Sequence, residues 1–511
     1  EQKGEDLNVN DVKKLTTDTS IGLILADIDQ AKLLSPLRAV PDFKVGLLRA
    51  EFVLGAIGVH YKALKAFDAG VLDEAIALAQ QPGAADKKSH ELAARMGNKE
   101  QSVSVTDRER LLYETLSVEH GPGLAASLEA TKKGIAERLQ GSGYATGHEF
   151  YVEMLSQKIS LFAHAFDGKD VIYRTTDYKS NEYRGLMGGK LFEGEEDNPM
   201  LGYRGVSRGV DAWEIEAFVK ARREYGAKNL HLMFPFVRTE EELMNTVATS
   251  AAQGLKRGED GLKVFVMAEI PSVASIPHTF LQHVDGFSIG SNDMTQGVLM
   301  TDRDSAKLQH TYDEEDPAVV QSMLSVIFAA RKVDKEVGFC GQGVSNSEFI
   351  AAMVSVAGID SASVTPDAYV KVKRLVHEIE ARKIGVAGLG AWMNEYRAQK
   401  MNDVLKDVVA AHVFDGVGAA KPKGDMAPAE AYDWLQTAMV QANTLALSSE
   451  PAAAEKGRAQ LAALRQAAKT VIYANTDWSK IVDTALRTAG FANAAECDDA
   501  IAARRAAHAH G

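Results

Sequence analysis

Cysteine is scarce in this sequence, and a long hydrophobic run is absent. Only Cys340 and Cys497 occur among 511 residues, too few for a disulfide framework, so we expect a reducing, cytoplasmic setting. No apolar segment approaches the roughly 20 residues that a membrane span needs. The first residues, EQKGEDLNVNDVKK, are polar and unlike a signal peptide. We therefore expect neither a secreted disulfide scaffold nor a membrane protein.

Positive charge is also in short supply. The 57 Lys and Arg residues are outnumbered by 70 Asp and Glu residues, which leaves a net charge of -13. This balance argues against a general nucleic-acid binder, because phosphate backbones are held by clustered Lys and Arg. It leaves room for a small anionic ligand, which needs only a local basic pocket. The hydrophobic share of 46% and charged share of 25% are those of an ordinary globular protein.

Short apolar runs recur along the chain, and most are followed by a segment of helical pattern. Near-continuous apolar runs suit parallel strands that are buried on both faces. Alternation with helices predicts an α/β fold, and eight such units predict a (β/α)8 TIM barrel. The eight expected strands are IGLILAD (21–27), VGLLR (45–49), VIYRTTD (171–177), LHLMFPFV (230–237), VFVMAEI (264–270), FSIGSND (287–293), VGFCGQG (337–343) and SASVTPD (361–367).

The spacing of these strands is uneven, and this predicts additions to the barrel. The second and third strands are separated by a charged stretch of helical pattern, which we interpret as a helical insertion at about 61–165. The long segment 178–229 is expected to be functional, as long loops in compact domains usually are. We assign residues 1–385 to the barrel. Residues 386–511 change to an Ala-rich composition and are interpreted as a helical C-terminal extension.

Polar residues follow several of the expected strands. In a TIM barrel the active site lies at the carboxyl ends of the strands, so these side chains should converge. Arg204 lies in a Gly-flanked loop, and Arg303 follows the sixth strand. The residues at the other strand ends are Arg49, Arg174, Glu269, Asn292, Asp293 and Cys340.

This set of side chains makes chemical sense around a phosphorylated ligand. The carboxylates of Glu269 and Asp293 are hard oxygen ligands of the kind that Mg²⁺ prefers. The arginines would surround a multiply charged anion, since guanidinium forks match phosphate and carboxylate geometry. Cys340 sits between Phe339 and Gly341, and a thiol at a strand end could deliver or remove a proton.

Each of these residues also has an ordinary structural explanation. An isolated Arg is more often part of a surface ion pair, and a lone Cys is usually a small buried hydrophobe. Glu269 could simply pair with a neighbouring Arg. Their shared position after strands or in Gly-rich loops favours a site. The residues alone thus predict a Mg²⁺-dependent barrel that acts on a small phosphorylated or multiply anionic ligand.

Several longer motifs go beyond this pattern. They are GLLRAEF, DYKSNEYRGLMGG, NPMLGYRGVSRG, FPFVRT, GLKRGEDGLKVFVMAEIPS, DGFSIGSNDMTQ, DRDS, GFCGQGVS and GIDSASVTPD. In this order they resemble the C-terminal barrel of phosphoenolpyruvate synthases (pyruvate, water dikinases), members of the PEP-utilising enzymes. The resemblance covers about residues 15–384 and extends more distantly to pyruvate phosphate dikinase and to enzyme I of the sugar phosphotransferase system.

The resemblance implies roles for the matching residues. Glu269 and Asp293 would bind Mg²⁺, and Cys340 would exchange a proton with the methylene carbon of phosphoenolpyruvate. Asn292, with the backbone near Ser291, would orient the pyruvyl group. The phosphate would be bound by Arg49, Arg174, Arg204 and Arg303. The implied reaction transfers a phosphoryl group between a phosphohistidine and the enolate oxygen of pyruvate, a step of gluconeogenesis, in a protein that is commonly a homodimer.

The sequence departs from the family because we find no motif for the phosphohistidine that carries the phosphoryl group. Family members carry the phosphohistidine in a Gly-Gly-x-Thr-x-His-Ala-like motif, whereas His60, His148 and His283 lie in IGVHYKAL, TGHEF and LQHVDG. An ATP-binding (ATP-grasp) domain is also not seen, and residue 1 falls about where the carrier domain would end. The resemblance therefore implies that the ATP-binding and phosphohistidine domains are on another chain or have been lost.

Two other functions remain open from the sequence. A stand-alone barrel could perform different chemistry on a phosphoenolpyruvate-like ligand, as a lyase or as a phosphotransferase served by a separate carrier. A non-catalytic barrel could bind phosphoenolpyruvate or act as an assembly scaffold. The presence of Cys340 together with both expected metal carboxylates argues against the scaffold, which needs neither.

Overall fold

Eight parallel strands form a closed barrel in which every strand pairs with its neighbours in the sequence, from β1 to β8 and back to β1. A computed structural model describes residues 8–102, 104–118, 123–411 and 424–508. The predicted (β/α)8 barrel is confirmed. The strands are β1 (Ser20–Leu25), β2 (Val45–Arg49), β3 (Val171–Arg174), β4 (Leu230–Phe234), β5 (Val264–Ala268), β6 (Gly286–Ile289), β7 (Glu336–Phe339) and β8 (Ser361–Val364).

Each strand begins close to the predicted position, but most end earlier than the apolar pattern suggested. The strand β3 ends at Arg174 rather than at Asp177, and β6 ends at Ile289 rather than at Asp293. Farther along, polar residues such as Asp177 and Asp293 have left the ladder and line a pocket at the strand ends. The barrel interior is filled by apolar side chains, among them Leu47, Met233 and Phe265.

Helices cover the outside of the barrel and connect its strands. Within this layer, α17 is buried along most of its length because it packs between the strands and the C-terminal helices. The helices of this layer are α2 (Ile28–Leu34), α3 (Ala50–Ile57), α10 (Gly147–Ala165), α12 (Ala212–Arg223), α13 (Glu240–Ala252), α14 (Pro271–Ser275), α15 (Pro277–Leu281), α16 (Ser291–Leu299), α17 (Pro317–Lys332), α18 (Gly343–Asn346), α19 (Glu348–Val356) and α20 (Tyr369–Ala381). The short helices α1 (Val9–Lys14) and α11 (Ser180–Arg184) lie at the N-terminus and after β3.

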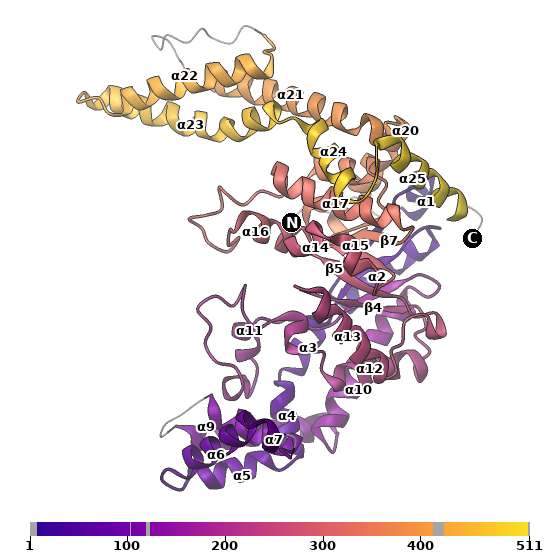
Figure 1. Ribbon diagram of the computed structural model, residues 1–511, viewed down its shortest axis with the longest axis vertical. Helices are drawn as coiled ribbons and strands as arrows, with labels where there is room; N and C mark the ends of the chain where they lie inside the picture. The colour runs from indigo at the N-terminus through magenta and orange to yellow at the C-terminus, as the bar shows by residue number, and fades with distance from the viewer. Residues whose placement is uncertain (1–7, 103, 119–122, 412–423, 509–511) are drawn as a thin grey trace.

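The residues between β2 and β3 form mostly helices. They are α4 (Tyr61–Asp68), α5 (Val71–Ala79), α6 (Ala84–Gly97), α7 (Lys99–Ser102), α8 (Asp107–Ser117) and α9 (Leu124–Ser142), followed by α10. Helix α10 packs on α2, α3 and α12, and so belongs to the outer layer of the barrel as well as to this segment. Figure 1 shows α4–α9 at one end of the long axis of the molecule.

Residues 385–411 and 424–508, the described part of the C-terminal segment, form five helices, which we call the C-terminal appendage. They are α21 (Gly385–Ala411), α22 (Pro428–Ala446), α23 (Pro451–Asn475), α24 (Trp478–Thr488) and α25 (Ala494–His508). Helices α21–α23 project from the barrel at the opposite end from α4–α9 (Figure 1) and have their own core, which includes Met401, Trp434 and Leu464. Helices α24 and α25 pack against α17. In the described parts of the chain, no helix is both long and apolar enough to cross a bilayer.

Gly286 at the start of β6 tests the close packing of the barrel. A Cβ atom at this position would lie 2.1 Å from the backbone oxygen of Glu336 on β7, which cannot move without breaking the ladder. We expect Gly286→Ala to lower the free energy of unfolding by about 1–3 kcal/mol, measured by urea denaturation. Gly97→Ala is the matched control, because nothing lies near its added Cβ. An equal effect of both substitutions would contradict this packing argument.

Candidate active site

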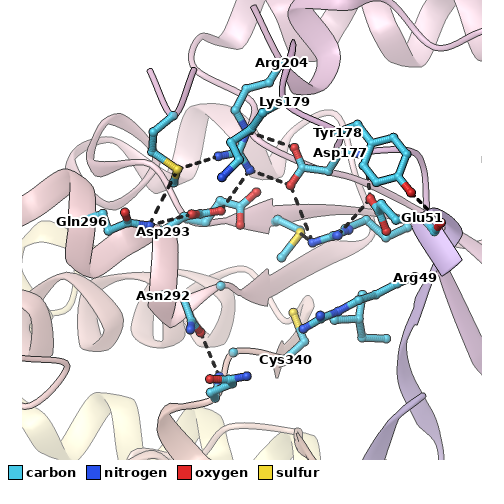
Figure 2. A pocket seen from close by; sticks show the side chains of 18 of the residues that line it. Arg49, Glu51, Asp177, Tyr178, Lys179, Arg204, Asn292, Asp293, Gln296 and Cys340 are labelled. Atoms are coloured by element: carbon cyan, nitrogen blue, oxygen red, sulfur yellow. Dashed lines mark hydrogen bonds and ion pairs between the residues drawn. The ribbon is translucent and has the colours of Figure 1, made fainter. Parts of the chain in front are cut away.

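The predicted site residues converge at the carboxyl ends of the strands. A cavity of about 360 Å³ is lined there by Arg49, Arg174, Arg204, Glu269, Asn292, Asp293, Arg303 and Cys340. Arg49 and Arg174 end their strands, while Glu269 and Cys340 directly follow theirs. Asn292 and Asp293 lie in the first turn of α16 instead of at the end of β6. Figure 2 shows Arg49, Arg204 and Cys340 on different sides of one space.

Arg49 and Arg174 face the cavity with unused hydrogen-bonding capacity. The Nη2 of Arg174 donates to Oε1 of Glu51 at 3.0 Å, but its buried Nε has no hydrogen-bond partner among the described residues, and neither has the buried Nε of Arg49. Burial and the neighbouring charge of Arg174 lower the pKa of Arg49. Buried donors without partners are costly, and two adjacent guanidinium groups repel each other. An anion bound between them would relieve both penalties.

Arg204 is held rigidly by a carboxylate and an aromatic ring. Its Nε and Nη2 donate to the two carboxylate oxygens of Asp177 at 3.1 and 2.7 Å, and its guanidinium lies 3.9 Å from the ring centroid of Phe236. Although burial opposes the charged form, Asp177 and Asp293 raise the pKa of Arg204. A bidentate ion pair with a stacked ring fixes the plane of the guanidinium. Arg204 is thus preorganised as a permanent positive charge beside the carboxylates.

Phe236 adopts a left-handed backbone conformation, with φ of 51°. This is unusual for a bulky residue and costs free energy. It directs the Phe236 amide to Oε1 of Glu269, which accepts a hydrogen bond of 2.6 Å. Gly205, with φ of 61°, packs so closely that an added Cβ would lie 2.7 Å from Cβ of Phe236. The strained backbone therefore serves to orient Glu269 and to support Arg204.

Three carboxylates meet at one side of the cavity. Asp177, Glu269 and Asp293 can each offer one oxygen atom such that all lie within 4.8 Å of one another. Burial, followed by the charges of Asp293 and Asp177, raises the pKa of Glu269 well above its usual range. Such mutual repulsion in a buried place is relieved by a cation, and an all-oxygen donor set suits Mg²⁺. Because Asp177 already has Arg204 as a bidentate partner, Glu269 and Asp293 are better suited to bind an ion.

Cys340 is a buried thiol at the floor of the cavity. Its Sγ lies 3.6 Å from the backbone oxygen of Ile289, and burial raises its pKa to about 11. The nearby guanidinium groups of Arg174 and Arg49 act in the opposite direction, because they favour the thiolate. At neutral pH the group is thus a protonated thiol that faces an arginine-lined cavity, an arrangement suited to proton donation.

Asn292 and Ser291 differ in how they meet the cavity. Asn292 lines it, and its Oδ1 accepts a hydrogen bond of 3.0 Å from the Gln342 amide. This contact leaves the Asn292 amide nitrogen to meet a ligand. The Ser291 hydroxyl points elsewhere: it donates to Oε1 of Glu314 at 2.6 Å and accepts from the Gly343 amide at 3.2 Å. Ser291 therefore supports the first turn of α16 with its side chain.

Arg303 is the least constrained of the predicted arginines. Its side chain is 45% exposed and lies 3.9 Å from Asp304, while its backbone amide donates to Oε1 of Gln296 at 3.2 Å. It lines the rim of the cavity from the loop after α16. The position of this guanidinium consequently depends on the position of the loop.

Several residues of the site were not singled out from the sequence. Glu51 accepts hydrogen bonds from Arg174 and from the Asp177 amide, the latter at 2.7 Å. Glu51 follows Arg49 by two residues, and Asp177 ends the third apolar run, so their positions were a usable signal. Phe236 carried no comparable signal, because its left-handed backbone and its contact with Arg204 appear only in three dimensions.

Comparison with known proteins assigns the chain to a protein family. The PEP-binding domain of PEP-utilising enzymes matches residues 3–381. The chain belongs to this family. The match covers the entire barrel with the cavity described above and ends at the last residue of α20. The C-terminal appendage lies beyond it.

Several curated relatives of the chain are named phosphoenolpyruvate synthase. The chain is 34% identical over 395 residues to that of Aquifex aeolicus, which covers 75% of this chain and 43% of the relative. It is 47% identical over 252 residues to that of Pseudomonas aeruginosa, covering 48% and 31%, and 47% identical over 236 residues to that of Escherichia coli, covering 45% and 30%. The chain thus spans less than half the length of these relatives.

Behind the cavity, Glu214 on α12 supports the turn that presents Asp177. Its Oε1 accepts hydrogen bonds from the Tyr173 hydroxyl at 2.8 Å and from the Thr176 amide at 2.9 Å. Burial raises the pKa of Glu214 to about 7. A raised pKa means that the folded protein binds a proton that the unfolded chain releases near pH 4. The resulting stabilisation is complete below about pH 4 and is lost as the pH rises through 7.

We therefore expect Glu214→Gln to remove part of the pH dependence of folding. The wild-type free energy of unfolding should fall by about 3 kcal/mol more than that of the variant between about pH 4 and pH 7.5, measured by urea denaturation. Glu216→Gln on the same helix is the control, because Glu216 is half exposed and pairs with His148 on the surface. Parallel pH profiles of the wild type and Glu214→Gln would contradict the assignment.

Proposed function

We propose that this barrel transfers a phosphoryl group between a phosphohistidine and the enolate oxygen of pyruvate, with Mg²⁺ as cofactor, as in phosphoenolpyruvate synthase (pyruvate, water dikinase). The observation that carries this proposal is the single cavity that combines unpaired arginine donors, clustered carboxylates and a buried thiol. Each of these groups has a use on a phosphorylated enol acid, and the family and its relatives point to the same ligand.

The arginines would bind the transferring phosphoryl group. Arg49 and Arg174 offer their unpaired donors, Arg204 supplies a fixed charge, and Arg303 approaches from the rim. Guanidinium groups aimed at an oxyanion stabilise the charge that spreads over its oxygens during transfer. The N–P bond of the phosphohistidine breaks as the O–P bond to the enolate forms. In the reverse direction the same groups hold the phosphate of phosphoenolpyruvate.

Glu269 and Asp293 would hold the Mg²⁺ ion. When bound there, the ion would act as a Lewis acid that stabilises negative charge on the ligand. The Phe236 amide keeps Glu269 aimed at the cavity, and Asp293 is flanked by Gln296 and Arg204. Asn292 would orient the pyruvyl group from the first turn of α16. Glu269 and Asp293 would therefore bind the metal, and Asn292 would bind the ligand.

Cys340 would move the proton. In the direction of pyruvate, the thiol gives its proton to the methylene carbon of the enolate, and in the opposite direction the thiolate takes a proton from the methyl group of pyruvate. Arg49 and Arg174 favour the transient thiolate electrostatically. Proton transfer and phosphoryl transfer thus occur at different atoms of one bound ligand.

The phosphoryl donor would lie on an ATP-binding and phosphohistidine unit separate from this barrel. Among the described residues no histidine lines the cavity. His60 instead has Glu193 as a buried partner at 2.8 Å, and His283 bonds to Glu240 on the surface. We expect this 511-residue chain alone to form no phosphoenolpyruvate from ATP and pyruvate in a coupled assay. ATP-dependent synthesis by the purified chain would show that the donor is internal.

Cys340→Ala tests the proton step. The variant should lose exchange of the pyruvate methyl protons with deuterated water by about 10²- to 10⁴-fold, followed by NMR, while binding of oxalate with Mg²⁺ stays nearly unchanged. Cys497→Ala serves as the control, because Cys497 is equally buried but lies in α25. Equal loss of exchange and of binding would make Cys340 a structural residue.

Glu269→Gln tests the metal site. Calorimetric binding of oxalate or phosphoenolpyruvate should require Mg²⁺ in the wild type and should be lost in Glu269→Gln, since the amide is a neutral and weaker metal ligand. The control Glu241→Gln changes an exposed carboxyl on α13. The metal assignment fails if the wild type binds equally well without Mg²⁺, or if Glu269→Gln binds like the wild type.

A further inference from the structure

The loop between α16 and α17, residues 300–316, carries Arg303 and a run of four acids. The last of them, Asp316, caps α17 with its side chain, and the three before it are Asp313, Glu314 and Glu315. Their side chains form hydrogen bonds both to the barrel and to the C-terminal appendage. The loop is therefore held between the barrel on one side and another part of the molecule on the other.

The middle acid faces the barrel. Oε1 of Glu314 accepts a hydrogen bond of 2.6 Å from the Ser291 hydroxyl. Ser291 is the first residue of α16 and directly precedes Asn292 and Asp293, which line the cavity. Displacement of Glu314 would thus act on the turn that presents both of these residues.

Asp313 and Glu315 contact the C-terminal appendage, and Glu315 also accepts a hydrogen bond from the Ser347 hydroxyl at the start of α19. Oδ2 of Asp313 accepts a hydrogen bond of 2.7 Å from the Tyr473 hydroxyl and lies 3.1 Å from Nζ of Lys469. Lys469 also lies 3.3 Å from the backbone oxygen of His310 in the same loop. Oε2 of Glu315 accepts a hydrogen bond of 2.9 Å from Nη1 of Arg397. Helices α21 and α23 therefore tie the loop at several points.

Arg397 on α21 is itself fixed by aromatic rings. Its guanidinium carbon lies 3.8 Å from the ring centroid of Phe349, 5.1 Å from that of Tyr473 and 5.3 Å from that of Trp478. Its buried Nε and Nη2 have no hydrogen-bond partner among the described residues. The rings hold a desolvated guanidinium so that one nitrogen reaches Glu315. These rings come from both parts of the molecule, since Phe349 belongs to barrel helix α19 whereas Tyr473 and Trp478 belong to the appendage. Arg397 is therefore held where the appendage meets the barrel.

We propose that the C-terminal appendage positions the 300–316 loop, and with it Arg303, for binding of the anionic ligand. This inference rests on the proposed function of the cavity. Tyr473, Lys469 and Arg397 are then positioning residues for ligand binding, although they lie beyond the segment that matches the family. Arg303 needs such support, because its half-exposed side chain has little in the barrel to hold it.

Tyr473→Phe is the most specific test, because it removes only the hydroxyl group that donates a hydrogen bond to Asp313. We expect the Kd for phosphoenolpyruvate in the presence of Mg²⁺ to rise about fivefold or more, with little change in the thermal midpoint. Tyr432→Phe is the matched control, since Tyr432 lies partly exposed on the neighbouring helix α22. Lys469→Gln should resemble Tyr473→Phe, whereas Lys456→Gln, at an exposed position of the same helix, should resemble the wild type.

A double-mutant cycle distinguishes positioning from general stabilisation. In an Arg303→Ala background, Tyr473→Phe should cause little further loss of binding, because the loop no longer carries the guanidinium. Additive losses would overturn the proposal, and so would an unchanged Kd in Tyr473→Phe alone.

The tie can also be followed without a ligand. Amide hydrogen exchange in residues 300–316 should become faster in Tyr473→Phe and stay unchanged in Tyr432→Phe. If the wild type binds neither oxalate nor phosphoenolpyruvate, the proposed function fails, while faster exchange would still show that the appendage holds the loop. Unchanged exchange in Tyr473→Phe would overturn the tie itself.

Discussion

Opposite charges buried together at the carboxyl ends of the strands are the constraint on which the rest of the structure depends. Glu269, Asp177 and Asp293 lie close enough to repel one another, and Arg174 and Arg204 lie among them. Such groups are costly to bury unless each has a partner. The bidentate pair of Arg204 with Asp177 and the bonds of Glu51 meet part of this need. The remaining imbalance is what a metal ion and an anion would compensate.

The surrounding barrel keeps these charges in place. The closed ladder brings the ends of eight strands to one rim, and the shortened strands leave the following residues free to enter the cavity. Local strain adds precision, since the left-handed Phe236 aims its amide at Glu269 and its ring at Arg204. Behind the rim, Glu214 and Glu51 hold the amides of Thr176 and Asp177. These two carboxylates thus support the cavity from its edge and from behind: Glu51 lines it, whereas Glu214 does not.

The C-terminal appendage adds a support that the barrel family match does not include. Its helices α21–α23 have a separate core, yet α21 and α23 reach back to the loop that carries Arg303. Asp313 and Glu315 of this loop contact the appendage, whereas Glu314 between them bonds to Ser291 of the barrel. Glu315 also bonds to Ser347 of the barrel. A segment held on both sides can transmit a displacement, which is why the appendage and the cavity are proposed to be coupled.

The sequence alone determined the barrel and most of the cavity lining, because buried parallel strands leave continuous apolar runs and active-site residues must follow them. The order of the eight strands was confirmed, and the cavity-lining residues Arg49, Glu269 and Cys340 were predicted from their place at the ends of the expected strands. Only the tertiary structure decided which partner each charge has. The pairing of Arg204 with Asp177 and the tie of Asp313 to Tyr473 join residues 27 and 160 positions apart. Such contacts depend on how helices and loops pack, which local periodicity does not encode.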